Sequence, residues 1–177
     1  MLRTRGFTLI ELMVTIALLA ILLGLAVPSF RTALQNNRIT AQANDLLTAF
    51  QLGRSEALKR NAPVVVCASS NGQSCGGPWV DGWIVAEDRA NAGDSTLAQD
   101  LQVLRVWPGP QGGITLSPSD APRVFRFLPR GAMDGEMGLS YPVTLEMSIP
   151  DCRGDQVRNI LINRSGRVTV ERAACSS

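Results

Sequence analysis

The hydrophobic positions of this chain form one long run near its N-terminus. From Phe7 to Val27 the chain reads FTLIELMVTIALLAILLGLAV, in which Glu11 is the only charged residue. As a helix this stretch would be about 31 Å long, at about 1.5 Å per residue, which matches the hydrocarbon thickness of a bilayer. The run therefore predicts a membrane-spanning helix.

The residues that flank this run set its expected orientation. Arg3 and Arg5 precede it, and no acidic residue occurs among the first ten. The positive-inside rule therefore predicts a single-pass segment with a cytoplasmic N-terminus. A cleaved signal peptide is disfavoured, because its apolar region is about 7 to 15 residues long and Pro28-Ser29-Phe30 is a poor cleavage site.

After Pro28 the hydrophobic spacing becomes that of an amphipathic helix. Apolar residues recur mostly three or four positions apart, which is the helical period. The helix is expected to end near Arg60, because the residue before Pro63 avoids helical angles. Pro28 itself predicts a kink or a melted stretch over 24–28, and the alternative is a helix end at the membrane surface. The face expected to pack on a sheet holds Phe30, Leu34, Ile39, Ala43, Leu46, Leu47, Phe50, Ala57 and Leu58, and the cations expected in solvent are Arg31, Arg38, Arg54, Lys59 and Arg60.

Beyond Pro63, short β-branched runs are separated by Gly, Pro, Asn and Asp, which is typical of an antiparallel β domain. The last two runs flank Arg164-Ser165-Gly166, and a tight turn there would use the freedom of glycine at positive φ. The predicted strands are PVVVCAS (63–69), GWIVAED (82–88), LQVLRVW (101–107), GITLS (113–117), RVFRFLP (123–129), VTLEMSI (143–149), NILIN (159–163) and RVTVE (167–171).

Four cysteines point to an oxidising compartment. Cys67 with Cys75, and Cys152 with Cys175, lack the spacing of a metal or redox motif, so disulfides are the better interpretation and the β domain should lie outside the cytoplasm. Four cysteines allow three pairings. We favour the sequential one, since each bond would then close a local loop.

The remaining composition argues against an enzyme. Histidine is absent, which removes the commonest general base and the commonest zinc ligand. The formal net charge of +2 is that of Arg3 and Arg5, so overall charge does not indicate nucleic acid. The acidic stretch 81–100 lacks the spacing of a calcium loop and is expected to be solvated. No catalytic residue, metal, cofactor or small-molecule substrate is predicted.

The sequence Gly6-Phe7-Thr8-Leu9-Ile10-Glu11 resembles the prepilin motif of type IV pilins and type II secretion pseudopilins. The resemblance implies that a membrane peptidase cuts between Gly6 and Phe7 and that the new amine on Phe7 is methylated. It also implies that Glu11 meets the terminal amine of a neighbouring subunit. A lone carboxylate in a membrane helix costs roughly 2.5 to 3.5 kcal/mol on insertion scales, and such a pair would offset that cost.

The segment CASSNGQSCGGPWVDGW (67–83) resembles a characteristic segment of the GspH/FimT family of minor pilins and pseudopilins. Ala86 departs from the aromatic expected after Gly82-Trp83-Ile84-Val85. We expect Trp79 and Trp83 to pack in the core rather than to bind a ligand. The implied fold is α+β and type IV pilin-like, with a long N-terminal helix packed on an antiparallel β domain. Its parts are a leader peptide (1–6), a transmembrane and polymerisation helix (7–28), an amphipathic helix (29–60) and a β domain (61–177).

The function implied by this resemblance is that of a minor type IV pilin, processed by prepilin peptidase and built into the tip or initiation complex of a pilus. Before assembly such a subunit lies in the bacterial inner membrane, and afterwards it lies in the periplasm or the pilus fibre. Its partners are major and minor pilins. It supports pilus assembly, twitching motility or DNA uptake. One alternative is a GspH-type pseudopilin of type II secretion.

A second alternative is a DNA receptor of natural transformation. Arg164, Arg167 and Arg172 surround the last hairpin, and exposed arginines can bind phosphates. Some FimT-like pilins bind DNA with a Gly-Arg-x-Arg motif, but here the matching positions read Gly166-Arg167-Val168-Thr169. The competing interpretation is a charged edge hairpin that resists aggregation.

Overall fold

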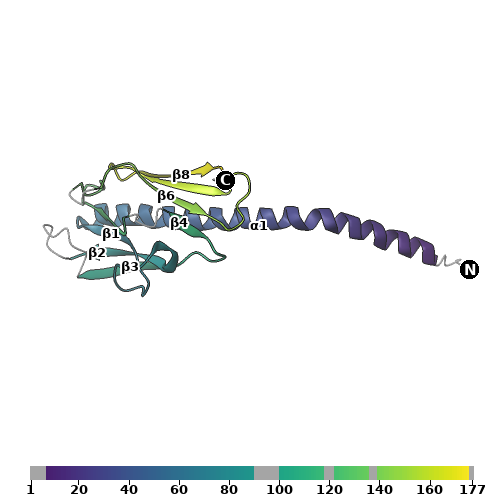
Figure 1. Ribbon diagram of the computed structural model, residues 1–177. Helices are drawn as coiled ribbons and strands as arrows, with labels where there is room; N and C mark the ends of the chain where they lie inside the picture. Colours follow the sequence, from purple (N-terminus) through teal and green to yellow (C-terminus); the bar gives the residue numbers. More distant parts are fainter. Residues whose placement is uncertain (1–6, 90–99, 118–121, 136–138, 176–177) are drawn as a thin grey trace, which may run out of the picture. The chain divides into compact units, whose positions relative to one another are not determined.

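A computed structural model describes residues 7–89, 100–117, 122–135 and 139–175. The chain forms two compact units, 1–37 and 38–177. Figure 1 shows one long helix and two antiparallel sheets, which is the predicted fold class.

Helix α1 spans Leu9–Arg60 without interruption, so its predicted end is confirmed. The melted stretch over 24–28 and the helix end at Pro28 are both wrong, as Figure 1 shows. The kink at Pro28 stays a prediction. Proline lacks an N–H and so removes one helical hydrogen bond. The turns on both sides remain helical in spite of that loss.

The second half of α1 has one buried face. The predicted packing residues Ile39, Ala43, Leu46, Phe50 and Ala57 are buried, whereas three others of the predicted set, Phe30, Leu34 and Leu58, are exposed. Gly53 also lies on the buried face, and a Cβ built on it would come within 2.7 Å of Val66 Cγ2. The helix therefore packs on strand β1 (Val64–Ala68) at a distance that suits a residue without a side chain.

The two sheets each contain four strands, and all the pairings are antiparallel. All eight predicted strands are present, with small differences at their ends. One sheet has the order β3-β2-β1-β5, formed by Leu101–Pro108, Gly82–Asp88, Val64–Ala68 and Val124–Phe127. The other has the order β4-β6-β7-β8, formed by Thr115–Ser117, Val143–Ser148, Val157–Ile162 and Val168–Ala173.

Aromatic rings fill the space between α1 and the sheets. The Phe50 ring lies 5.2 Å from that of Phe125 and 6.5 Å from that of Trp79, measured between ring centroids. Trp79 begins the short 3-10 helix η1 (Trp79–Asp81), and its indole N–H donates to the carbonyl of Pro122 at 3.1 Å. Trp83 is also fully buried, so the predicted packing role of both tryptophans is confirmed.

The disulfides join Cys67 to Cys75 and Cys152 to Cys175. This is the sequential pairing that we predicted. The first bond closes the loop between β1 and η1. The second ties the end of the chain after β8 to the loop before β7.

One part of the acidic stretch differs from the prediction. Asp88 is not solvated: its side chain is 1% exposed and lies 2.6 Å from the guanidinium of Arg126, which also approaches Asp134 at 3.6 Å. The antiparallel pairing of β1 with β2 and β5 brings the two strand ends together. Residues 90–99 of the acidic stretch lie outside the described residues.

Candidate functional site

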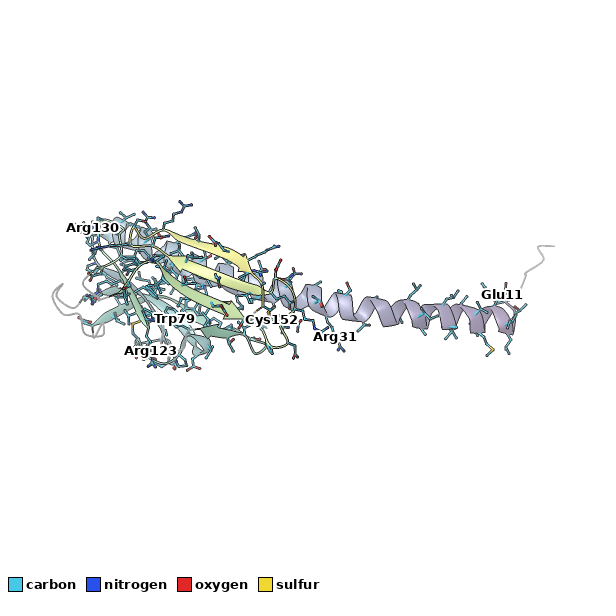
Figure 2. The ribbon with its side chains drawn as sticks, turned by 45° about the horizontal axis from the view of Figure 1, so that its top comes forward. Glu11, Arg31, Trp79, Arg123, Arg130 and Cys152 are labelled. Atoms are coloured by element: carbon cyan, nitrogen blue, oxygen red, sulfur yellow. A yellow bond between two sulfur atoms is a disulfide. The ribbon has the colours of Figure 1, made fainter. Side chains whose placement is uncertain are left out.

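Helix α1 begins with a hydrogen-bonded cap formed by Thr8 and Glu11 (Figure 2 labels Glu11). The Thr8 N–H donates to Glu11 Oε2 at 3.0 Å and the Thr8 hydroxyl donates to the same oxygen at 2.9 Å. In return the Glu11 N–H donates to Thr8 Oγ1 at 3.3 Å. This is a capping box, in which two residues three positions apart satisfy each other's free N–H groups. Gly6, the predicted cleavage residue, lies outside the described residues.

Thr8 is a residue that our sequence reasoning missed. The signal was present, because Thr8-Leu9-Ile10-Glu11 just before an apolar run is the S/T-x-x-E pattern of a capping box. The resemblance to a processing motif directed attention to Glu11 alone.

The cap supplies donors to Glu11 but no positive charge. Among the residues that the structure describes, no basic side chain forms an ion pair with Glu11. A carboxylate that must enter a membrane therefore still needs a cation or a proton.

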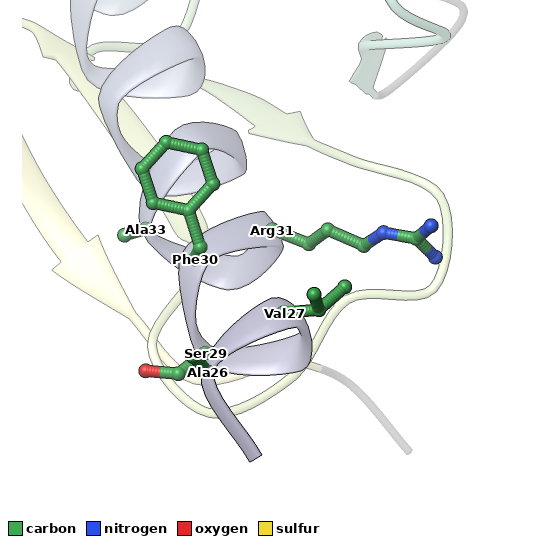
Figure 3. A pocket seen from close by; sticks show the side chains of 6 residues that line it. All are labelled: Ala26, Val27, Ser29, Phe30, Arg31 and Ala33. Atoms are coloured by element: carbon green, nitrogen blue, oxygen red, sulfur yellow. The ribbon is translucent and has the colours of Figure 1, made fainter. Parts of the chain in front are cut away.

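The first unit exposes a large apolar surface. An 18-residue window of α1 has a mean hydropathy of 2.6, so the helix is long and apolar enough to cross a membrane. Its large side chains are exposed on every side of the helix, for example Leu9 at 76% and Ile21 at 62%. A shallow pocket continues this surface to the end of the apolar run (Figure 3). It is lined by Ala26, Val27, Ser29, Phe30, Arg31 and Ala33.

The structure separates the three arginines predicted for DNA. Arg164 lies in the turn between β7 and β8 and Arg167 follows it, and both are exposed. Gly166 has a φ of +78°, as the predicted tight turn requires, and its N–H donates to the carbonyl of Asn163. Arg172 is also exposed but lies farther along β8, roughly 16 Å from Arg167 at about 3.3 Å per residue.

Arg172 instead lies beside a buried arginine. It pairs with Arg158 across β7 and β8. Arg158 is 2% exposed, and it donates to the carbonyls of Asp155 and Val157 and to the hydroxyl of Thr40. Burial, together with the charge of Arg172, lowers the pKa of Arg158. The three predicted arginines therefore lie at the two ends of the hairpin, Arg164 and Arg167 at its turn and Arg172 at the opposite end.

Two other arginines lie beside the turn. Arg54 Nη1 donates to the carbonyl of Gly166 at 3.4 Å, and Arg54 Nε would be 3.3 Å from a Cβ on Gly131. Arg130 is exposed and precedes the buried Gly131 in the turn after β5. Their positions in the sequence, on α1 and after β5, gave no signal of this proximity.

A long N-terminal helix packed through its second half on antiparallel sheets is the type IV pilin-like fold. The minor pilin FimU of Pseudomonas aeruginosa has this fold, with a TM-score of 0.56 and 19% sequence identity over 80% of this chain and 95% of that chain. A second crystal form of FimU gives a TM-score of 0.52 and 20% sequence identity, over 78% of this chain and 98% of that chain.

The chain belongs to the GspH family, since the family model described as type II transport protein GspH matches residues 42–166. The prokaryotic N-terminal methylation motif matches residues 1–27. The minor pseudopilin EpsH of Vibrio cholerae aligns with a TM-score of 0.45 and 12% identity, over 77% of this chain and 97% of that chain. No curated protein matches the chain. The family consists of minor pilins and pseudopilins, which are structural subunits that assemble with other pilins.

Proposed function

We propose that this chain is a minor type IV pilin, cleaved by prepilin peptidase between Gly6 and Phe7, methylated on Phe7 and then built into the tip or initiation complex of a pilus. It acts as a structural subunit and not as an enzyme. The observation that carries the proposal is the apolar helix of the first unit, which is exposed on all sides and holds a carboxylate that has no counter-charge among the described residues. Such a surface is stable only in a membrane or against other apolar helices.

Glu11 would direct assembly. Cleavage after Gly6 creates an amine four residues before Glu11, and in a filament the carboxylate of one subunit would pair with the amine of the next. The pair is worth most in a low dielectric, where an isolated charge is costly. Apolar contacts supply most of the adhesion in this scheme, and the charge pair selects the register.

The orientation and parts of the subunit follow from the same features. Arg3 and Arg5 favour a cytoplasmic N-terminus in the inner membrane, and the two disulfides favour a β domain in the periplasm and later on the fibre. We assign a leader to 1–6, the polymerisation helix to 7–28, an amphipathic helix to 29–60 and the β domain to 61–177.

Substitution of Glu11 tests the proposal. Glu11→Gln keeps a capping box, because glutamine can replace glutamate there, but removes the charge. Loss of one member of a buried ion pair costs about 3 to 5 kcal/mol. Glu11→Gln and Glu11→Ala should therefore both lower the amount of the subunit in sheared filaments by at least about tenfold, while Gly6–Phe7 cleavage continues.

Thr15→Val is the matched control. Thr15 is a polar residue of the same helix whose hydroxyl donates to the Leu12 carbonyl at 2.8 Å, so its replacement should leave incorporation unchanged. Normal incorporation of Glu11→Gln would overturn the charge-pair mechanism.

A role in type II secretion is the first alternative, and the description of the matching family model favours it. The physical features described above are common to both systems. Crosslinking of the full chain in its own cells separates them, because the captured partners would be pilins in one case and pseudopilins in the other.

A DNA receptor is the second alternative, favoured by the exposure of Arg164 and Arg167 on a loop. The test is fluorescence anisotropy of labelled duplex DNA with the full chain in non-ionic detergent micelles. Binding should weaken steeply as salt is raised, and a chain that does not bind at low salt is not a DNA receptor.

A further inference from the structure

Four arginines from three separate segments meet at one end of the β domain. They are Arg54 of α1, Arg130 of the turn after β5, and Arg164 and Arg167 of the turn before β8. We call them the arginine end. Figure 2 shows Arg130 at the opposite end of the β domain from Cys152.

Backbone contacts hold these segments together. The Gly166 Cα faces the Gly131 carbonyl so closely that a Cβ there would clash with its oxygen. The Met133 N–H donates to the Arg164 carbonyl at 3.0 Å, and a Cβ on Gly135 would lie 2.6 Å from Arg164 Nη2. Arg54 reaches the same turn through the Gly166 carbonyl. The arrangement is therefore set by the fold and does not depend on flexible side chains alone.

The positive charge of the arginine end is not neutralised within the described part of the chain. None of its four arginines forms an ion pair there. Two acids of the described residues near this end have other partners: Glu56 bonds Arg60 and Lys59, and Asp134 approaches Arg126. Such a concentration of guanidinium groups favours an anionic partner.

The chemistry of the surface favours phosphate over an acidic protein. Guanidinium groups bind phosphate and carboxylate oxygens alike through paired N–H donors, so the choice between the two partners rests on the apolar content of the surface. Among the described residues, Leu58 is the exposed large apolar residue at this end, and one such side chain is too little for the apolar centre of a protein interface. We propose that the arginine end is a binding surface for the phosphate backbone of duplex DNA, and that Arg54 and Arg130, rather than Arg172, complete it.

This inference rests on the DNA-receptor role proposed above and is independent of assembly through Glu11. Contacts to four phosphates predict a slope of about −3.6 in a plot of log affinity against log salt, so affinity should fall about 150-fold between 50 and 200 mM salt. Binding should also be independent of base sequence, because backbone contacts carry no sequence information.

The test compares two double variants of the full chain in non-ionic detergent micelles, with duplex DNA as the probe. Arg54→Ala with Arg130→Ala removes two charges from the arginine end. It should reduce the fall in affinity over the same salt range to about 12-fold. Arg153→Ala with Arg172→Ala removes two exposed charges near the Cys152–Cys175 bond, and it should behave like the unchanged chain.

Arg130→Ala alone provides a second variant, because its side chain lies on an exposed turn and its loss should not affect folding. It should make the slope less steep by about 0.9. The inference would be overturned if both double variants lost salt dependence of DNA affinity equally, or if only the Arg153 and Arg172 variant lost it. Either result would leave DNA binding itself in place. Failure of the unchanged chain to bind DNA would remove both the inference and the receptor role, but not the assembly role. Competition by polyglutamate as strong as that by DNA would also overturn it, since the surface would then recognise carboxylates.

Discussion

Glu11 and Arg126 are both charged groups placed among apolar residues, and they are stabilised in different ways. Arg126 is 8% exposed, and the same chain supplies its counter-charges, Asp88 and Asp134. Glu11 lies on an exposed apolar helix, and its bonded partner is the neutral Thr8. The second unit thus contains the counter-charges of Arg126. Within the residues described, the first unit contains no counter-charge for Glu11, which agrees with a subunit whose neighbours in a filament supply that charge.

The largest effect on stability is expected for Arg126, whose counter-charges lie in the same chain. Arg126→Ala would leave Asp88 and Asp134 without their cation in a buried site, and should lower the free energy of unfolding by about 3 to 5 kcal/mol. Denaturant unfolding of the full chain in micelles, followed by tryptophan fluorescence, measures this loss. Arg123→Ala is the control, since Arg123 is exposed and should change stability by less than about 0.5 kcal/mol. Equal stability of the two variants would show that the buried pair contributes nothing.

A smaller effect is expected at the cap of α1. Thr8→Val removes the hydroxyl that bonds Glu11 and should destabilise the first turn by about 1 kcal/mol, as for other N-cap substitutions. Amide hydrogen exchange of the Glu11 N–H should become about fivefold faster, whereas Thr8→Ser should keep the slow rate. The β domain should unfold as before in both variants. Unchanged exchange in Thr8→Val would mean that the capping box is absent in solution.

The smallest effect is expected at the surface network that joins the end of α1 to β2. Arg60 bonds both Glu56 and Glu87, and its hydrogen bond lowers the pKa of Glu56. A lowered carboxyl pKa contributes stability above the ordinary value of about 4.3, and this contribution disappears as pH falls through the folded value. Unfolding of Glu56→Gln should therefore depend less on pH below about 4.3 than that of the unchanged chain. Identical pH profiles would contradict the assignment.

Local patterns predicted most of the fold. The spacing of apolar residues predicted α1, Pro63 predicted its end at Arg60, and the β-branched runs predicted all eight strands. The alternative of a melted stretch at Pro28 failed, because the helix tolerates the loss of one hydrogen bond. Prediction also failed at Asp88, where an acidic pattern suggested solvent but strand pairing placed the side chain against Arg126.

The prepilin motif, the membrane-length helix and the Cys67–Cys75 pair depend on residues close together in the chain, so the sequence alone was sufficient to predict them. The place of Arg126, the close approach at Gly53 and the arginine end depend on contacts between residues far apart in the chain. Arg54 and Gly166 are 112 positions apart. No periodicity or motif predicts a contact between residues so far apart in the chain, because the contact forms only when the helix and both sheets pack around one core.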